Sequence, residues 1–240
     1  MRLPRAQKAV VVGASLGVAG AIRQAIMRNP LAWPGLLGIN SGAALAATAI
    51  IVEFRTIPQD LLTLLIFAGA LVMSAAIYAF SWRQGTSSVR IILIGIGLGP
   101  LAGAGASFIS SFGDPPAVQR AMIWLSGSLQ DSRWERVRIL ALWSIPPFVA
   151  AWIAARELDL IAFGDTVARR LGQRVNLLRG MAVLICAALS GAAIAAAGLI
   201  GFVGLAARRI MPPVQLPVGL FTALLGAPFF GFLLWKRRNA

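Results

Sequence analysis

Short polar segments divide the chain into seven long runs that contain no charged residue. These runs cover residues 9–22, 31–52, 61–82, 91–113, 139–155, 181–207 and 210–235. A helix needs about 20 apolar residues to cross the hydrocarbon core of a bilayer, and five of the runs exceed that length. The two shorter runs reach it if the flanking basic residues snorkel to the membrane surface, namely Lys8, Arg23, Arg138 and Arg156. The pattern predicts an all-α fold, a polytopic transmembrane helical bundle of about seven spans.

Composition supports a membrane protein rather than a water-soluble one. Hydrophobic residues make up 58% of the 240 positions and charged residues only 12%, whereas a soluble domain carries about 25% charged residues. Basic residues flank the apolar runs and give a net charge of +14, which indicates contact with anionic lipid head groups rather than nucleic acid. We expect a single membrane-spanning domain over residues 1–240. The one cysteine, Cys186, lies inside a run and leaves the redox compartment open.

An odd number of spans places the two ends of the chain on opposite sides of the membrane. Lys and Arg are slightly more numerous on the side that holds the segment 156–179 and the C-terminal WKRRN. Because cytoplasmic loops carry the excess of positive charge, we expect a cytoplasmic C-terminus and an N-terminus outside.

Glycines recur at the spacing that brings helices into close contact. Gly13, Gly17 and Gly20 fall on one face of the first run, and Gly99 and Gly103 are four residues apart in the fourth. Small residues let helix backbones approach each other where lipid supplies no hydrophobic drive for association. We expect these faces to pack inside one bundle, with a dimer interface as the alternative.

Residues 24–42, QAIMRNPLAWPGLLGINSG, interrupt the apolar pattern between two predicted spans. Pro30 and Pro34 disfavour helical geometry at the residues before them. Gly35, Gly38 and Gly42 permit close backbone contacts. Irregular backbone at membrane depth is tolerated only where protein or a water-filled cavity covers it. The segment is therefore expected to face the bundle and not the lipid.

The residue types that membrane catalysis or ion coupling require are scarce. The chain has no histidine, and no ionisable residue lies in the middle of a run. Proton relays and intramembrane metal sites use buried Asp, Glu or His, so we expect no catalytic and no metal-binding residue. The sequence also lacks a P-loop motif for nucleotide hydrolysis. Energy for any transport would therefore come from a partner protein.

A polar segment at 157–179 separates the fifth and sixth runs. Within it, Asp165 is a suitable N-cap for the short helix TVARRL, and Gly172 is a natural stop at the C-terminal end of that helix. A short amphipathic helix on the membrane surface is either an anchor in the lipid interface or a contact site for another protein. The residues alone leave both alternatives open.

Six segments, in order along the chain, resemble the sequence pattern of one known protein family. They are RLPR (2–5), RNPLAWPGLLGINSGAAL (28–45), WLSGSL (124–129), LDLIAFGDTVARRLG (158–172), GLIGFVGL (198–205) and QLPVGLFTALLGAPFFGFLL (215–234). Together they resemble the permeases of FecCD-type ABC transporters, which import iron-siderophores, haem and vitamin B12. The resemblance covers nearly the whole chain.

This resemblance implies a permease subunit of an ABC importer in the bacterial inner membrane. Its partners would be a second permease subunit, a cytoplasmic ATPase that binds the ATP, and a periplasmic substrate-binding protein, so the chain itself would need no cofactor. The matching positions of the ATPase-coupling loop are Gly164, Asp165, Ala168, Arg169, Leu171 and Gly172. The arginines that dock the binding protein match Arg2, Arg5 and Arg208. The pathway or packing positions are Asn29, Pro30, Gly35, Gly38, Gly42, Gly99 and Gly103.

The chain departs from the usual ten-span pattern of this family. We expect a first span ahead of RLPR to be absent and a pair of spans to be missing between Ala206 and Ala207. Gln215 stands where the family often has Glu. A shortened chain could also be a remnant that no longer transports, and a secondary carrier is a third hypothesis. Several bulky chelates, and both homodimeric and heterodimeric assembly, are compatible with the pattern.

Overall fold

The computed structural model describes residues 2–28, 38–54, 57–82, 85–127 and 132–199, and every regular element in these ranges is a helix. The helices are α1 Arg2–Met27, α2 Ile39–Glu53, α3 Gln59–Ser81, α4 Ser88–Phe112, α5 Pro115–Leu125, α6 Trp134–Ala162, α7 Asp165–Arg170 and α8 Val175–Ala197. The all-α prediction is confirmed. Five of these helices are long and apolar enough to cross a membrane, namely α1, α3, α4, α6 and α8. The run 210–235 lies outside the described residues, so the number of spans and their orientation stay predictions.

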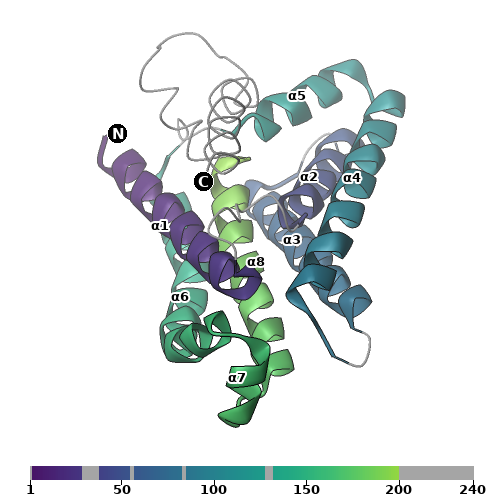
Figure 1. Cartoon of the computed structure of the whole chain (residues 1–240). Helices are drawn as coiled ribbons and strands as arrows, with labels where there is room; N and C mark the ends of the chain where they lie inside the picture. Colours follow the sequence, from purple (N-terminus) through teal and green to yellow (C-terminus); the bar gives the residue numbers. More distant parts are fainter. Residues whose placement is uncertain (1, 29–37, 55–56, 83–84, 128–131, 200–240) are drawn as a thin grey trace, which may run out of the picture.

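Helix α8 forms the centre of the described bundle, with α1, α3 and α6 packed around it (Figure 1). Of its most apolar 18-residue window, 78% is buried, against 17% for α4 at the periphery. Small residues allow α8 to lie close to its neighbours. At Gly191, for example, an added Cβ would lie only 2.9 Å from the Cβ of Ala70 on α3. Burial on all sides explains why the sequence of α8 is apolar all round.

Helix α2 packs between α3 and α4 through glycines. A Cβ added at Gly42 would lie 2.3 Å from the Cβ of Met73 on α3. At the start of α2, Gly38 has φ 67°, and a Cβ there would lie 2.9 Å from the carbonyl oxygen of Gly95 on α4. Only glycine combines this left-handed conformation with so close an approach. The interpretation of Gly38 and Gly42 as close-contact positions is confirmed.

The start of α2 lies inside the bundle and not at its surface. Gly38 lies against Gly95, which is about 10 Å along the axis of α4 from its first residue, Ser88. With 15 residues, α2 is about 22 Å long, shorter than the ~30 Å hydrocarbon core. Gly38 and Ile39 are both buried, as expected for a break that faces the bundle. The other predicted residues of this segment lie outside the described residues, namely Asn29, Pro30 and Gly35.

The glycine face of α1 does not pack within the described part of the chain. A Cβ added at Gly13, Gly17 or Gly20 would meet no described atom within 4 Å. The helix contacts its neighbours through the opposite face, where Val12 and Ala19 are fully buried. The described residues therefore give these three glycines no packing partner, and their packing inside the bundle stays a prediction.

Two basic side chains of α1 are buried, contrary to the expectation that they snorkel. Arg23 is fully buried, and its Nη2 donates a hydrogen bond to Oγ of Ser190 on α8 at 2.5 Å. Lys8 is buried as well. Helix α1 continues for a full turn beyond Arg23, so Arg23 does not lie at the end of the helix. Its side chain is on the packed face of α1 and points into the bundle. The other two flanking residues, Arg138 and Arg156, are exposed.

The run pattern does not predict α5, which lies across one end of the bundle (Figure 1). This helix begins at Pro115, and proline in the first turn suits its fixed φ and missing N–H. Ala117 and Ala121, four residues apart, are buried, and α5 packs against α2. The segment is too short and too polar to form an apolar run, so its only signal was a proline start followed by small residues at helical spacing.

Candidate coupling surface at the α7 end

The helix ends form two separate surfaces, with α7 at one end of the bundle and α5 at the other (Figure 1). At the α7 end, Oγ of Ser88 on α4 donates to the carbonyl oxygen of Ile26 on α1 at 2.5 Å. The hydroxyl of Tyr78 on α3 donates to the carbonyl oxygen of Asn176 on α8 at 2.8 Å. These bonds join α4 to α1 and α3 to α8 near α7.

Two glycines set the path of the chain around α7. Gly164, between α6 and α7, has φ 122°, and Gly172, after α7, has φ 82°. Residues with side chains rarely adopt these conformations. The N–H of Gly172 donates to the carbonyl oxygen of Arg169, and the N–H of Gln173 donates to that of Ala168, both at 3.0 Å. These bonds satisfy the carbonyls of the last turn, and the predicted helix and its stop at Gly172 are confirmed.

Ala168 faces inward and fixes α7 to the bundle. Its side chain is fully buried in a cluster with Ile161 of α6 and Val175 of α8, and Leu178 packs against this cluster. Ala168 therefore lies on the inner side of α7, and its place in the coupling loop stays a prediction. The alanine is small because the backbone of α7 lies close to both neighbouring helices.

The outer side of the α7 segment exposes apolar side chains. Phe163, which follows α6, is 76% exposed, Leu171, which follows α7, is 62% exposed, and Val167 between them is also exposed. Arg169 and Arg170 are exposed on the same short helix. Exposed apolar side chains next to charged ones are typical of contact with another protein or with the membrane interface. We call Phe163, Val167 and Leu171 the α7 patch.

Asp165 does not cap α7, contrary to the prediction. The N-cap position belongs to Gly164, and no side-chain cap bond is made. The carboxylate of Asp165 instead accepts hydrogen bonds from Arg28, at the end of α1, and from Arg179 of α8. Two opposite charges from other helices outcompete the weaker bond to a backbone N–H. Sequence reasoning missed both arginines, since neither is near Asp165 in the local pattern of the short helix.

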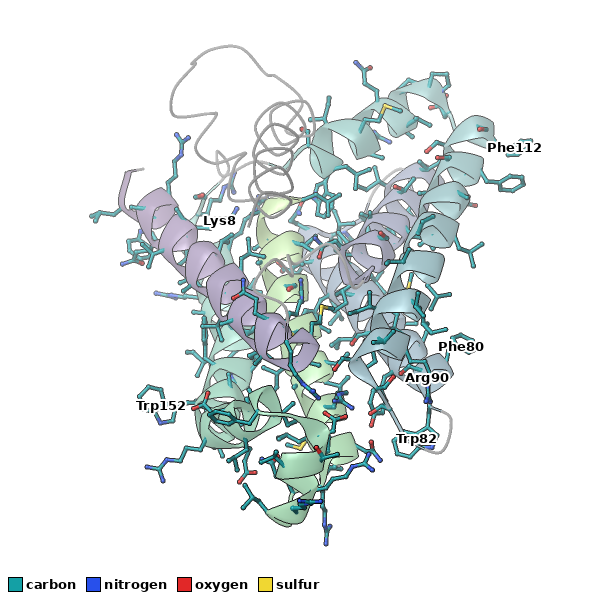
Figure 2. The ribbon with its side chains drawn as sticks, in the orientation of Figure 1. Lys8, Phe80, Trp82, Arg90, Phe112 and Trp152 are labelled. Carbon is teal, nitrogen blue, oxygen red and sulfur yellow. The ribbon has the colours of Figure 1, made fainter. Side chains whose placement is uncertain are left out.

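Helix α4 presents a long open face to the outside of the described bundle. Half of its exposed residues are small, namely Gly97, Pro100, Gly103, Ala104, Ser107 and Ser111, and the other half are large and apolar, namely Val89, Leu93, Ile96, Leu101, Phe108 and Phe112. Phe112, at the edge of this face, points away from the bundle in Figure 2. Gly99 packs inward against Gly38, whereas a Cβ at Gly103 would meet no described atom within 4 Å. Gly99 therefore lies in a close contact between α4 and the start of α2, whereas the role of Gly103 stays a prediction.

The opposite end of the bundle contains a cavity of about 440 Å³. Helices α1, α3, α5, α6 and α8 line it, and its polar residues include Lys8, Asp60, Arg120 and Arg136. Arg5, one of the predicted docking residues, is exposed on α1 near this end. The side chain of Arg2 and the whole of Arg208 lie outside the description. In the described ranges, no group of three or more His, Cys, Asp or Glu could hold a metal ion.

Five apolar helices of spanning length, packed around a buried central helix, are typical of a multi-pass membrane protein. The model of the FecCD transport family matches residues 1–207. The chain belongs to the FecCD transport family.

Individual relatives agree with this assignment. The chain is 36% identical to the Fe(3+)-citrate import system permease protein YfmE of Bacillus subtilis (strain 168), over 97% of this chain and 80% of the relative. It is 35% identical to the hemin transport system permease protein HmuU of Yersinia pestis, over 100% of this chain and 83% of the relative. The solved structure "An inward-facing conformation of a putative metal-chelate type ABC transporter" superposes with a TM-score of 0.84 at 27% identity, covering 98% of this chain and 86% of that one.

The alignments also bear on the length of the chain. The alignment with the hemin permease runs over 279 positions although this chain has 240 residues, so some positions of the relative have no counterpart here. The family model ends at residue 207, next to the junction after Ala206 where a pair of spans is expected to be missing. The alignment length shows that this chain lacks some internal positions of that relative, while the place of the missing spans stays a prediction.

Proposed function

We propose that this chain is the membrane-spanning permease subunit of an ATP-binding-cassette importer for an iron-siderophore or a related metal chelate. The α7 patch carries the proposal, because an exposed apolar surface on a short, firmly anchored helix suits insertion into a groove of a partner protein. The partner would be a cytoplasmic ATPase that binds and hydrolyses ATP. The chain itself would hold no cofactor and catalyse no covalent reaction.

The open face of α4 supports a second permease subunit and a shared pathway. Small residues such as Gly97, Ala104 and Ser107 leave room for a bulky chelate, and their few polar groups bind it weakly enough to let it pass. Aromatic and aliphatic residues at the edge of this face, including Leu101 and Phe108, offer the apolar contacts that a neighbouring subunit needs. We infer a dimer of permease subunits with α4 beside the central pathway.

The opposite end of the bundle would receive the periplasmic substrate-binding protein in the bacterial inner membrane. Arg5 is exposed there, and Arg2 begins the same helix. Guanidinium groups form planar, two-bond contacts with carboxylates that lysine does not reproduce. This arrangement requires the α7 end to be cytoplasmic, in agreement with the orientation inferred from the basic residues.

The ATPase contact is tested with the purified chain and its ATPase subunit. In the double variant Phe163→Ala/Leu171→Ala, capture of the ATPase should weaken at least ~10-fold, because central apolar contacts dominate such interfaces. Trp152→Ala is the matched control, since Trp152 is a highly exposed aromatic of α6 that points away from the bundle (Figure 2). Equal capture by the double variant and the parent protein would exclude the α7 patch as the ATPase contact.

A second candidate is a remnant that binds the ATPase but no longer transports. The internal gap in the alignments favours it, because missing helices would remove part of the wall around the pathway. Uptake of a ferric chelate into cells that lack their own permease distinguishes the two candidates. Restored uptake supports the importer, and ATPase capture without uptake supports the remnant.

A further inference from the structure

One carboxylate at the α7 end lies between two arginines from different helices. Nη2 of Arg179, on α8, donates to both carboxylate oxygens of Asp165, at 2.9 and 3.1 Å. Nη2 of Arg28, at the end of α1, donates to Oδ1 of the same carboxylate. The side chain of Arg179 is 0% exposed and that of Asp165 29% exposed, so the inner ion pair is largely shielded from water. We call these three residues the Asp165 cluster.

The same guanidinium also reaches the connection between α3 and α4. Nη1 of Arg179 donates to the carbonyl oxygen of Thr86 at 2.7 Å. The N–H of Thr86 in turn donates to Oδ1 of Asn176 at 3.1 Å, and the hydroxyl of Thr86 donates to the same oxygen at 3.3 Å. Arg179 therefore joins α7 on one side to the start of α4 on the other.

Separating Asp165 from Arg179 would cost free energy, and this cost opposes movement of α7 relative to α8. A buried guanidinium that loses its carboxylate leaves an uncompensated charge in a medium of low dielectric constant, which is strongly unfavourable. Movement of α7 away from α8 would separate Arg179 from the only carboxylate that contacts it among the described residues. Asp165 makes no cap bond to its own helix, so its contribution lies in the ion pairs. We expect α7, α8 and the start of α4 to move as one unit.

We propose that the Asp165–Arg179 ion pair is a positioning element that transmits displacement of α7 to the pathway helix α4. This inference rests on the proposed function, in which α7 receives movement from the ATPase and α4 lines the pathway. Arg28 adds a second, more exposed connection from α7 to the end of α1. That end contacts the start of α4 through the bond from Ser88 to Ile26. Two sets of polar contacts, one through Arg179 and one through Arg28, thus connect α7 to the same end of α4.

The test uses the full complex of permease, ATPase and binding protein in proteoliposomes, with a ferric chelate as substrate. In Asp165→Asn the side chain keeps its size and loses its charge. We expect at least a fivefold fall in chelate transported per ATP hydrolysed, while ATPase capture stays within twofold of the parent protein. Arg28→Gln should lower the same ratio less, because Arg28 is partly exposed and leaves the inner pair intact. Asp114→Asn, the same chemical change at an exposed site beside α5, is the matched control and should leave the ratio unchanged.

The outcomes separate the two claims. If the parent protein shows no ATP-driven uptake, the proposed function and this inference both fall. If the parent transports and Asp165→Asn transports equally well per ATP, the inference alone is overturned. A parallel loss of thermal stability, ATPase capture and transport in Asp165→Asn would assign the pair a purely structural role and also overturn it. Should that variant not fold, Arg179→Lys takes its place, because lysine keeps the charge but lacks the planar guanidinium that bonds both Asp165 and Thr86. An unchanged ratio in Arg179→Lys overturns the inference, and a reduced ratio supports it.

Discussion

Arg23 and Ser190 show how a charged side chain is accommodated between two apolar helices. Nη2 of Arg23 donates to the serine hydroxyl, while Nε and Nη1 have no hydrogen-bond partner among the described residues. No Asp or Glu is buried in the described ranges. A charged donor in a site of low dielectric constant depends strongly on each bond that it makes. The hydroxyl of Ser190 is therefore worth more here than on a surface.

We predict that Ser190→Ala lowers the stability of the folded protein by about 1.5–3 kcal/mol, the range for a lost hydrogen bond to a charged group. The measurement is thermal unfolding in detergent. Ser107→Ala is the control, because Ser107 is exposed on α4 and its loss should change the stability by less than ~0.5 kcal/mol. Equal unfolding of the two variants would show that the Ser190 bond contributes nothing.

The roles of single residues could be predicted from the sequence only where they depend on neighbours along the chain. Gly172 and the short helix before it follow from local rules, and the structure confirms them. Asp165 satisfies the same local rules for an N-cap, but its partner Arg28 is 137 residues away along the chain. Local patterns contain no information about such a neighbour. The role of Asp165 therefore required the three-dimensional structure.

At the scale of elements, the length of an apolar run predicts a helix well and its ends poorly. The runs 61–82 and 91–113 correspond closely to α3 and α4. The run 31–52 does not, because Gly38 adopts a left-handed conformation and α2 starts only at Ile39. The proline and glycine signals near that point were visible in the sequence. Their physical consequence, a helix that begins inside the bundle, depends on the contact with α4.

Glycine spacing also needs the structure to distinguish packed from open faces. We predict that Gly42→Ala destabilises the protein by about 1–3 kcal/mol, because its Cβ would overlap Met73 and the backbone of α3. Gly17→Ala should be neutral or stabilising by up to ~1 kcal/mol, since no described atom lies near and alanine favours the helix. Thermal unfolding of the two variants is the comparison. A destabilised Gly17→Ala protein together with an unaffected Gly42→Ala protein would reverse the assignment of the two faces.

At the scale of the whole molecule, the two ends of the bundle carry different chemistry. The α7 end combines an apolar patch with exposed arginines, and the opposite end combines Arg5 with a largely apolar cavity whose charged residues are Lys8, Asp60, Arg120 and Arg136. One end suits a groove in a partner protein and the other suits acidic side chains.

We predict that capture of the substrate-binding protein depends on the arginines at the start of α1. The double variant Arg2→Ala/Arg5→Ala should bind several-fold more weakly at low salt, and the difference should shrink at high salt because exposed ion pairs are screened. Arg208→Ala is the third variant of this set. Arg156→Ala, an exposed arginine of α6, is the control. Equal capture of the binding protein by all variants at both salt concentrations would remove the docking role.

Transport by the reconstituted complex tests the central claim most directly. Proteoliposomes that contain this chain and its ATPase would receive the binding protein loaded with a radiolabelled ferric chelate. The importer function predicts accumulation of label that requires both ATP and the binding protein, and that falls to background with a non-hydrolysable ATP analogue. A complex that assembles and hydrolyses ATP but accumulates no label would contradict the claim.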